Sequence, residues 1–196
     1  MKLKHTIPLS LLMAFSLTAS PAPRDEYAIS ASELALLPKF CRYLSPGNFR
    51  PEARHLAMKG RAPGEHAHHF CHGMKYLIRA RRALGDKQAR KEALQRALGE
   101  FSYVEEHTKN PRGMLLPYVA LYKGEAFDQL GRRQEALRAY LKAVKLNPKL
   151  SRAYAKLADL FVALDQKEKA VKVLRYGIKK TRSKSLVRRL KQLQKQ

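Results

Sequence analysis

The chain has 196 residues, of which 40 are lysine or arginine and 16 are aspartate or glutamate, so its formal net charge is +24. Its length suits a single domain with a buried core, and it lacks the glycine-rich phosphate loops and nucleophile motifs of common enzyme classes. A charge of this size points to an anionic partner or to basic, solvated helix surfaces.

The first twenty residues have the pattern of an export signal. Lys2 and Lys4 precede a short apolar stretch over 7–17, and small residues follow it, with cleavage expected after Ala19. The stretch is too short to favour a membrane-spanning helix. We therefore expect a signal peptide over 1–20 and a mature protein that is periplasmic or secreted, with no transmembrane segment after cleavage.

The segment 21–65 is expected to be an irregular extension. It contains one short helix over 31–44, which Pro38 should break, and then a loop over 45–65 that is rich in proline and glycine. Two longer helices are expected next, over 66–83 and 87–107, because apolar residues recur at helical spacing in both. They form a hairpin over 66–111 that ends at Asn110 and Pro111.

The next segments, 117–150 and 151–184, are two copies of a repeat of 34 residues. Small and aromatic residues recur at matching positions: Ala120, Gly124, Phe127, Gly131, Ala136, Tyr140, Ala143 and Pro148 fall opposite Tyr154, Ala158, Phe161, Asp165, Ala170, Leu174, Gly177 and Arg182. This period and this pattern resemble the tetratricopeptide repeat (TPR) family. In that family each repeat is a pair of helices, A and B, and the repeats stack into a curved surface that holds other proteins.

The resemblance implies an all-α fold, a short TPR-like helical-hairpin array of about two and a half repeats within 66–196, after an irregular N-terminal extension. The hairpin 66–111 counts as half a match, because its first helix lacks the glycine spacing of the family. The segment 185–196 is expected to be a C-terminal capping helix with a leucine seam. Its basic residues are expected to face outward: Arg188, Arg189, Lys191 and Lys195.

In the family, helix A residues line a concave groove that binds the partner. Carried onto this chain, the partner-binding residues are Tyr118, Leu121, Glu125, Asp128, Arg152 and Asp159. Three of these side chains are acidic and one is basic, whereas the backs of the B helices carry many lysines and arginines. We therefore expect an acidic, partly apolar groove inside a basic shell, and a partner segment of apolar and basic character.

The residues with the most reactive side chains lie near the start of the first hairpin. The chain has two cysteines, Cys41 and Cys71, and in an exported protein two cysteines most simply form a disulfide. A metal site is a second interpretation, since His68 and His72 are one helical turn apart within the cluster His66–His72. That spacing matches no established metal motif, so no metal and no other cofactor is expected.

These patterns predict a non-enzymatic adaptor or scaffold of the bacterial cell envelope, whose groove binds an envelope protein or peptide. Two alternatives stay open. One is a metal- or redox-linked exported protein that uses Cys41, Cys71 and the histidines, and the other is a basic protein whose outer face binds a polyanion or a membrane surface. Nucleic acid is not expected as a partner, because export would separate the protein from it. Since two and a half repeats form only a small groove, a homodimer that extends the stack is a further expectation.

Overall fold

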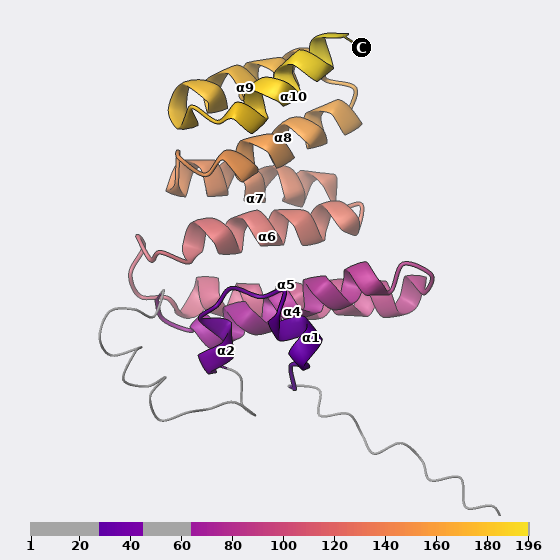
Figure 1. Ribbon diagram of the computed structural model, residues 1–196, viewed down its shortest axis with the longest axis vertical. Helices are drawn as coiled ribbons and strands as arrows, with labels where there is room; N and C mark the ends of the chain where they lie inside the picture. Colours follow the sequence, from indigo (N-terminus) through magenta and orange to yellow (C-terminus); the bar gives the residue numbers. More distant parts are fainter. Residues whose placement is uncertain (1–27, 45–63, 196) are drawn as a thin grey trace, which may run out of the picture.

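The computed structural model describes residues 28–44 and 64–195. The predicted signal peptide over 1–20, the residues that follow it up to 27 and nearly all of the predicted loop over 45–65 lie outside the described residues. The described part of the chain is helical, without a β-strand (Figure 1). The prediction of an all-α, TPR-like array is confirmed for these residues.

The helices follow one another with short connections. Two single-turn helices come first, α1 (Ala31–Leu34) and α2 (Cys41–Leu44), and Pro38 lies between them as expected. The longer helices then form three pairs and a final single helix: α4 (Ala67–Arg82) with α5 (Lys87–His107), α6 (Leu116–Gln129) with α7 (Arg133–Leu146), α8 (Ser151–Ala163) with α9 (Lys167–Thr181), and α10 (Lys184–Lys195).

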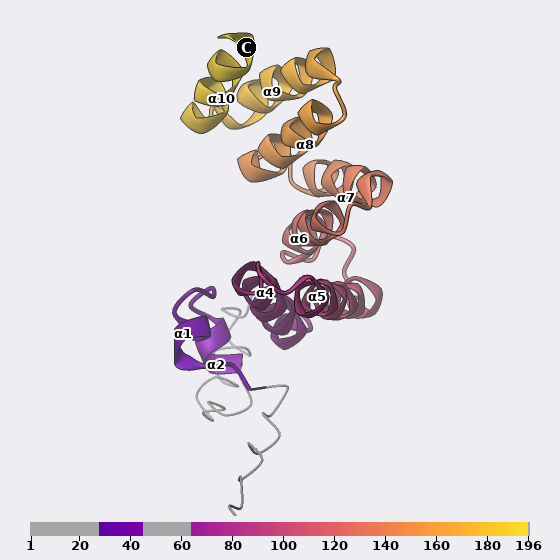
Figure 2. The same ribbon diagram turned by 90° about the vertical axis from the view of Figure 1, so that its right-hand side faces the viewer.

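The pairs stack on one another in chain order. From α4 to α10, each helix packs against the next one along the chain, and the first helices of successive pairs also meet, α4 with α6 and α6 with α8. Figure 2 shows that α1, α2 and α10 project from the two ends of the stack toward the same side, the side on which α4 and α6 lie. We call the surface of α4, α6 and α8 between these ends the inner face.

A glycine lets the two helices of each pair approach closely. In the second pair, a Cβ atom built on Gly124 would lie 2.5 Å from Cδ1 of Tyr140, which is fully buried on α7. In the first pair, a Cβ atom on Gly73 would lie 2.5 Å from Cε1 of Phe101. Although the first hairpin lacks the glycine spacing of the family, Gly73 of α4 allows the same close approach as Gly124 of α6.

The turn inside each repeat needs a left-handed backbone. Gly131 has φ 76° between α6 and α7, and Asp165, at the matching position of the second repeat, has φ 55° between α8 and α9. Glycine adopts this conformation without steric cost, and aspartate is one of the few other residues that tolerate it. The turn geometry is thus kept although the residue type changes.

The core is divided into three clusters of buried side chains that follow one another along the stack. The first joins α2, α4, α5 and one side of α6, the second joins α6, α7 and α8, and the third joins α8, α9 and α10. Since neighbouring helices share each cluster, the stability of one pair depends mainly on the pairs beside it. Among the described helices, none combines the length and apolar character needed to cross a membrane.

Candidate functional site

Two of the predicted groove residues on α6 lie in different surroundings. The side chain of Tyr118 is 38% exposed on the inner face. Leu121 is only 1% exposed, because it packs in the core between α6, α7 and α8 with Ala136, Ala153 and Leu157. The placement of Leu121 on the groove surface is thus corrected, since a partner cannot reach a side chain that the neighbouring helix covers.

The predicted groove acids are paired with arginines of the same chain. Oε2 of Glu125 on α6 accepts a hydrogen bond from Nη2 of Arg152 on α8 at 3.1 Å, and the Arg152 guanidinium also lies over the ring of Tyr122, 5.2 Å from its centroid. Asp159 on α8 accepts from both Nε and Nη2 of Arg189 on α10. The two acids occupy equivalent positions of the repeat, and each is paired with an arginine two helices further along the chain, on α8 and on α10.

This pairing neutralises the negative charge that was expected on the inner face. Asp128 is also bound, by Arg133 at the start of α7, so none of the three acids is left without a cation. The side chains of Arg152 and Arg189 are about half exposed; Glu125 is nearly covered, whereas Asp159 is about as exposed as Arg189. The inner face therefore presents arginines that are oriented by carboxylates, together with the partly exposed Asp159, in place of unpaired acids.

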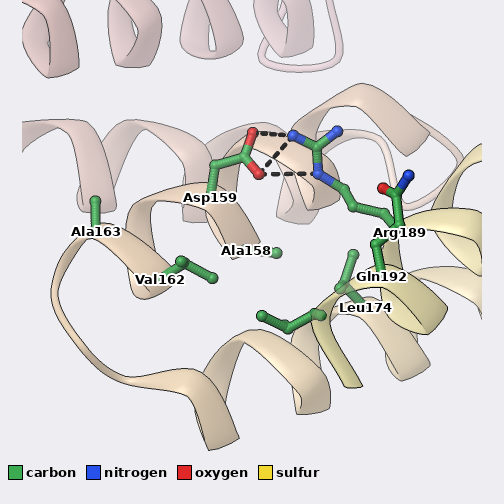
Figure 3. A pocket seen from close by; sticks show the side chains of 8 residues that line it. Ala158, Asp159, Val162, Ala163, Leu174, Arg189 and Gln192 are labelled. Carbon is green, nitrogen blue, oxygen red and sulfur yellow. Dashed lines mark hydrogen bonds and ion pairs between the residues drawn. The ribbon is translucent and has the colours of Figure 1, made fainter. Parts of the chain in front are cut away.

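A pocket of about 410 Å³ opens at the C-terminal end of the inner face, between α8, α9 and α10. Figure 3 shows the Asp159–Arg189 pair beside it, with Val162 and Ala163 on one side and Gln192 on the other. The floor consists of apolar side chains of α8, α9 and α10, Ala158, Leu174 and Leu193. The pocket suits a ligand group that places an apolar side chain on the floor and a hydrogen-bond acceptor near Arg189.

The sequence did not assign the residues that α10 contributes to this pocket. Arg189 was expected to face outward with the other bases of the capping helix, but it turns toward Asp159, while Leu193 closes the pocket floor. Only the packing of α10 against α8 decides this orientation. The repeat could have indicated this role. Asp159 lies 34 residues after Glu125, so it occupies the same place in its repeat and would be expected to pair with a base two helices further along the chain.

The cysteines form the predicted disulfide. Cys41 on α2 and Cys71 on α4 are bonded and fully buried, at a sequence separation of 30 residues. The same end of the structure is held by Glu33, which caps α1 through Ser30 and accepts from Nε of Arg79 at 2.7 Å. The ion pair and the cap lower the pKa of Glu33 to about 2 against the opposing effect of burial. Both cysteines are consumed by the bond, so the chain offers no free thiol for redox chemistry.

The histidines gather where α4 begins and α5 ends. The ring of Tyr103 lies between those of His69 and His107, with centroid distances of 3.9 Å to each, and His69 is hydrogen-bonded to Glu100 at 2.7 Å. His68 is exposed whereas His72 is buried, so the predicted pair points into different surroundings. Among residues 28–44 and 64–195, no three His, Cys, Asp or Glu side chains are arranged to hold one metal ion.

His72 should make stability depend on pH. Burial, with positive Lys75 and neighbouring histidines, lowers the pKa of His72 from 6.5 to about 4. The unfolded chain therefore takes up a proton between these values that the folded chain does not, so the free energy of unfolding should fall as pH drops from 6.5 toward 4, by about 3 kcal/mol in all. Urea unfolding over this range should show the slope, and His72→Gln should flatten it; an unchanged slope in the variant would assign the effect to other groups.

Comparison with known proteins agrees with the geometry of the stack. Residues 117–150, which are α6 and α7 with their flanking turns, match the family model described as tetratricopeptide repeat. A search of curated proteins finds no match. Repeats of this kind are modules for protein–protein interaction. Residues 117–150 therefore match a tetratricopeptide repeat, and the helix pairs stacked on both sides of it have the arrangement of a TPR-type array.

Proposed function

We propose that the protein is a non-enzymatic adaptor that holds a segment of a partner protein on its inner face, after export to the periplasm or the cell exterior. The observation that carries the proposal is the apolar pocket beside the Asp159–Arg189 pair, at the end of a face built from TPR helices. The N-terminal signal pattern supports export, and so does the disulfide, because disulfides persist in oxidising compartments.

The chemistry of the inner face defines the kind of segment that it can hold. Val162 is 44% exposed at the pocket and Tyr118 is exposed on α6, so the segment should place apolar side chains against both. Arg152 and Arg189 each have unused N–H groups beyond those that face their carboxylates. They favour carboxylate or backbone carbonyl oxygens of the partner, and the segment should be apolar with neutral or acidic polar groups.

The test places arginines at the two exposed inner positions. The variant Tyr118→Arg with Val162→Arg should weaken capture of the partner at least about tenfold, because two charges would stand where apolar contacts are expected. The matched control is Leu84→Arg with Leu141→Arg, which adds the same charge at exposed apolar positions in the turn between α4 and α5 and on α7. Both variants change exposed residues, so both should fold like the wild type.

The measurement is cross-linking in the producing cell, followed by affinity capture of the full chain and mass spectrometry. We expect one envelope protein that the wild type and the control recover and the inner-face variant loses, in the periplasmic or secreted fraction. Equal recovery by both variants would refute a role for the inner face. Loss with the control alone would place the partner on a surface of the stack other than the inner face.

A further inference from the structure

The outer surface of α9 carries a concentration of positive charge that partner binding on the inner face does not use. The helix has six lysines and arginines and one acid, Glu168. Its buried face consists of Ala170, Leu174 and Gly177, at i, i+4 and i+7. Lys172, Arg175 and Lys179 fall on the side opposite to these residues, and the structure leaves all three exposed. We call this surface the α9 face.

These cations have no partner among the residues that the structure describes. The ion pairs found elsewhere in the stack involve Arg79, Lys123, Arg132, Arg133, Lys142, Arg152 and Arg189, and none involves a base of α9. Lys172 and Arg175 are three residues apart, and Arg175 and Lys179 are four apart, so the like charges repel along the helix. An external anion that binds this face would relieve that repulsion.

One aromatic side chain lies in the middle of the charges. Tyr176 is 54% exposed, and Nζ of Lys180 lies 5.4 Å from the centroid of its ring. The ring of Tyr176 also packs near the ring of Tyr154 on α8, with centroids 6.0 Å apart, while about half of its side chain stays exposed. A tyrosine in this position has an apolar ring and a polar hydroxyl, a combination suited to the boundary between lipid headgroups and water.

The shape of the α9 face favours a planar anion array over a nucleic acid strand. Proteins that hold single strands use a basic groove in which several aromatic rings stack on successive bases. The α9 face is the convex side of a helix, with Tyr176 as its one aromatic side chain. The pocket described above opens elsewhere, between α8 and α10. A broad cationic surface around one interfacial aromatic ring matches the headgroup layer of an anionic membrane.

We propose that the α9 face docks the protein peripherally on a phospholipid leaflet rich in anionic headgroups. Lys172, Arg175 and Lys179 contact headgroup phosphates, and Tyr176 enters the interfacial layer. The binding is electrostatic, so it weakens as salt rises. It leaves the inner face directed away from the bilayer contact and open to a protein partner.

The experiment measures partition of the full chain onto vesicles of phosphatidylcholine, with and without phosphatidylglycerol, at low and high salt. The variant Lys172→Gln, Arg175→Gln, Lys179→Gln removes three charges from the α9 face. The control Lys184→Gln, Arg188→Gln, Lys191→Gln removes the same residue types, also exposed, from α10. The N-terminal apolar stretch is identical in all three proteins, so its contribution cancels when anionic and neutral vesicles are compared.

We expect the wild type to prefer anionic vesicles and to lose that preference at high salt. Each base near the surface contributes about fivefold in partition, so the α9 variant should lose about a hundredfold and the α10 control much less. Equal losses in the two variants would overturn the proposal, because net charge alone would then explain binding. It would also be overturned if the α9 variant kept its affinity for vesicles while losing affinity for a single-stranded oligonucleotide.

Discussion

Gly124→Ala should destabilise the protein markedly, because Gly124 is buried where α6 packs closely on α7. The new Cβ atom would lie 2.5 Å from Cδ1 of Tyr140, a distance that side chains do not tolerate, and the ring is fully buried with no room to move aside. Overpacking of this kind costs about 1–3 kcal/mol and exceeds the gain of somewhat under 1 kcal/mol that alanine brings to a helix. We expect the free energy of unfolding to fall by about 2 kcal/mol, measured by urea denaturation.

The chain offers a control at Gly99 in the middle of α5. A Cβ atom on Gly99 would meet no other atom within 4 Å, so Gly99→Ala should stabilise the protein by about 0.5–1 kcal/mol through helix propensity alone. Combining Gly124→Ala with Tyr140→Leu should cost less than the sum of the two single changes, because the shorter side chain makes room for the methyl group. Simple additivity would mean that the ring and the glycine do not compete for the same space.

Removing the disulfide should have the second large effect, and that effect should be local. A bond between residues 30 positions apart restricts the unfolded chain enough to contribute about 3–4 kcal/mol. In the described part of the chain, α2 packs on α4, at the end of the stack opposite to α8, α9 and α10 (Figure 1). Cys41→Ala with Cys71→Ala should therefore raise hydrogen exchange in α1, α2 and α4, while α8 and α9 keep the protection of the wild type.

Reduction provides an independent check on this result. A reducing agent should shift the unfolding of the wild type to that of the double variant and should leave the double variant unchanged. Paired substitution is preferable to a single one, because a lone cysteine would leave a reactive thiol. A change in unfolding free energy far below the expected value would show that the disulfide contributes little to stability. Loss of protection throughout α8 and α9 would show that the N-terminal helices are coupled to the whole stack.

The local structure follows from the sequence because its causes are local. Helix bounds depend on apolar spacing, on turn residues and on proline, and the predicted helix over 87–107 coincides with α5. The 34-residue period depends on side-chain size at positions such as Gly124 and Tyr140, which can be compared by aligning the two copies. The pairing of Cys41 with Cys71 needed only the count of two cysteines.

The inner face depended on contacts between helices that are far apart in sequence. Leu121 and Tyr118 are both on α6, yet one is core and the other surface, because α8 covers only one side of the helix. Glu125 and Asp159 look like free acids until α8 and α10 bring Arg152 and Arg189 against them. The sequence alone determined the helices, the repeat and the total charge. Only the packing of one helix against the next decided which charges are paired and which remain exposed, because an ion pair requires two side chains within a few ångströms of each other.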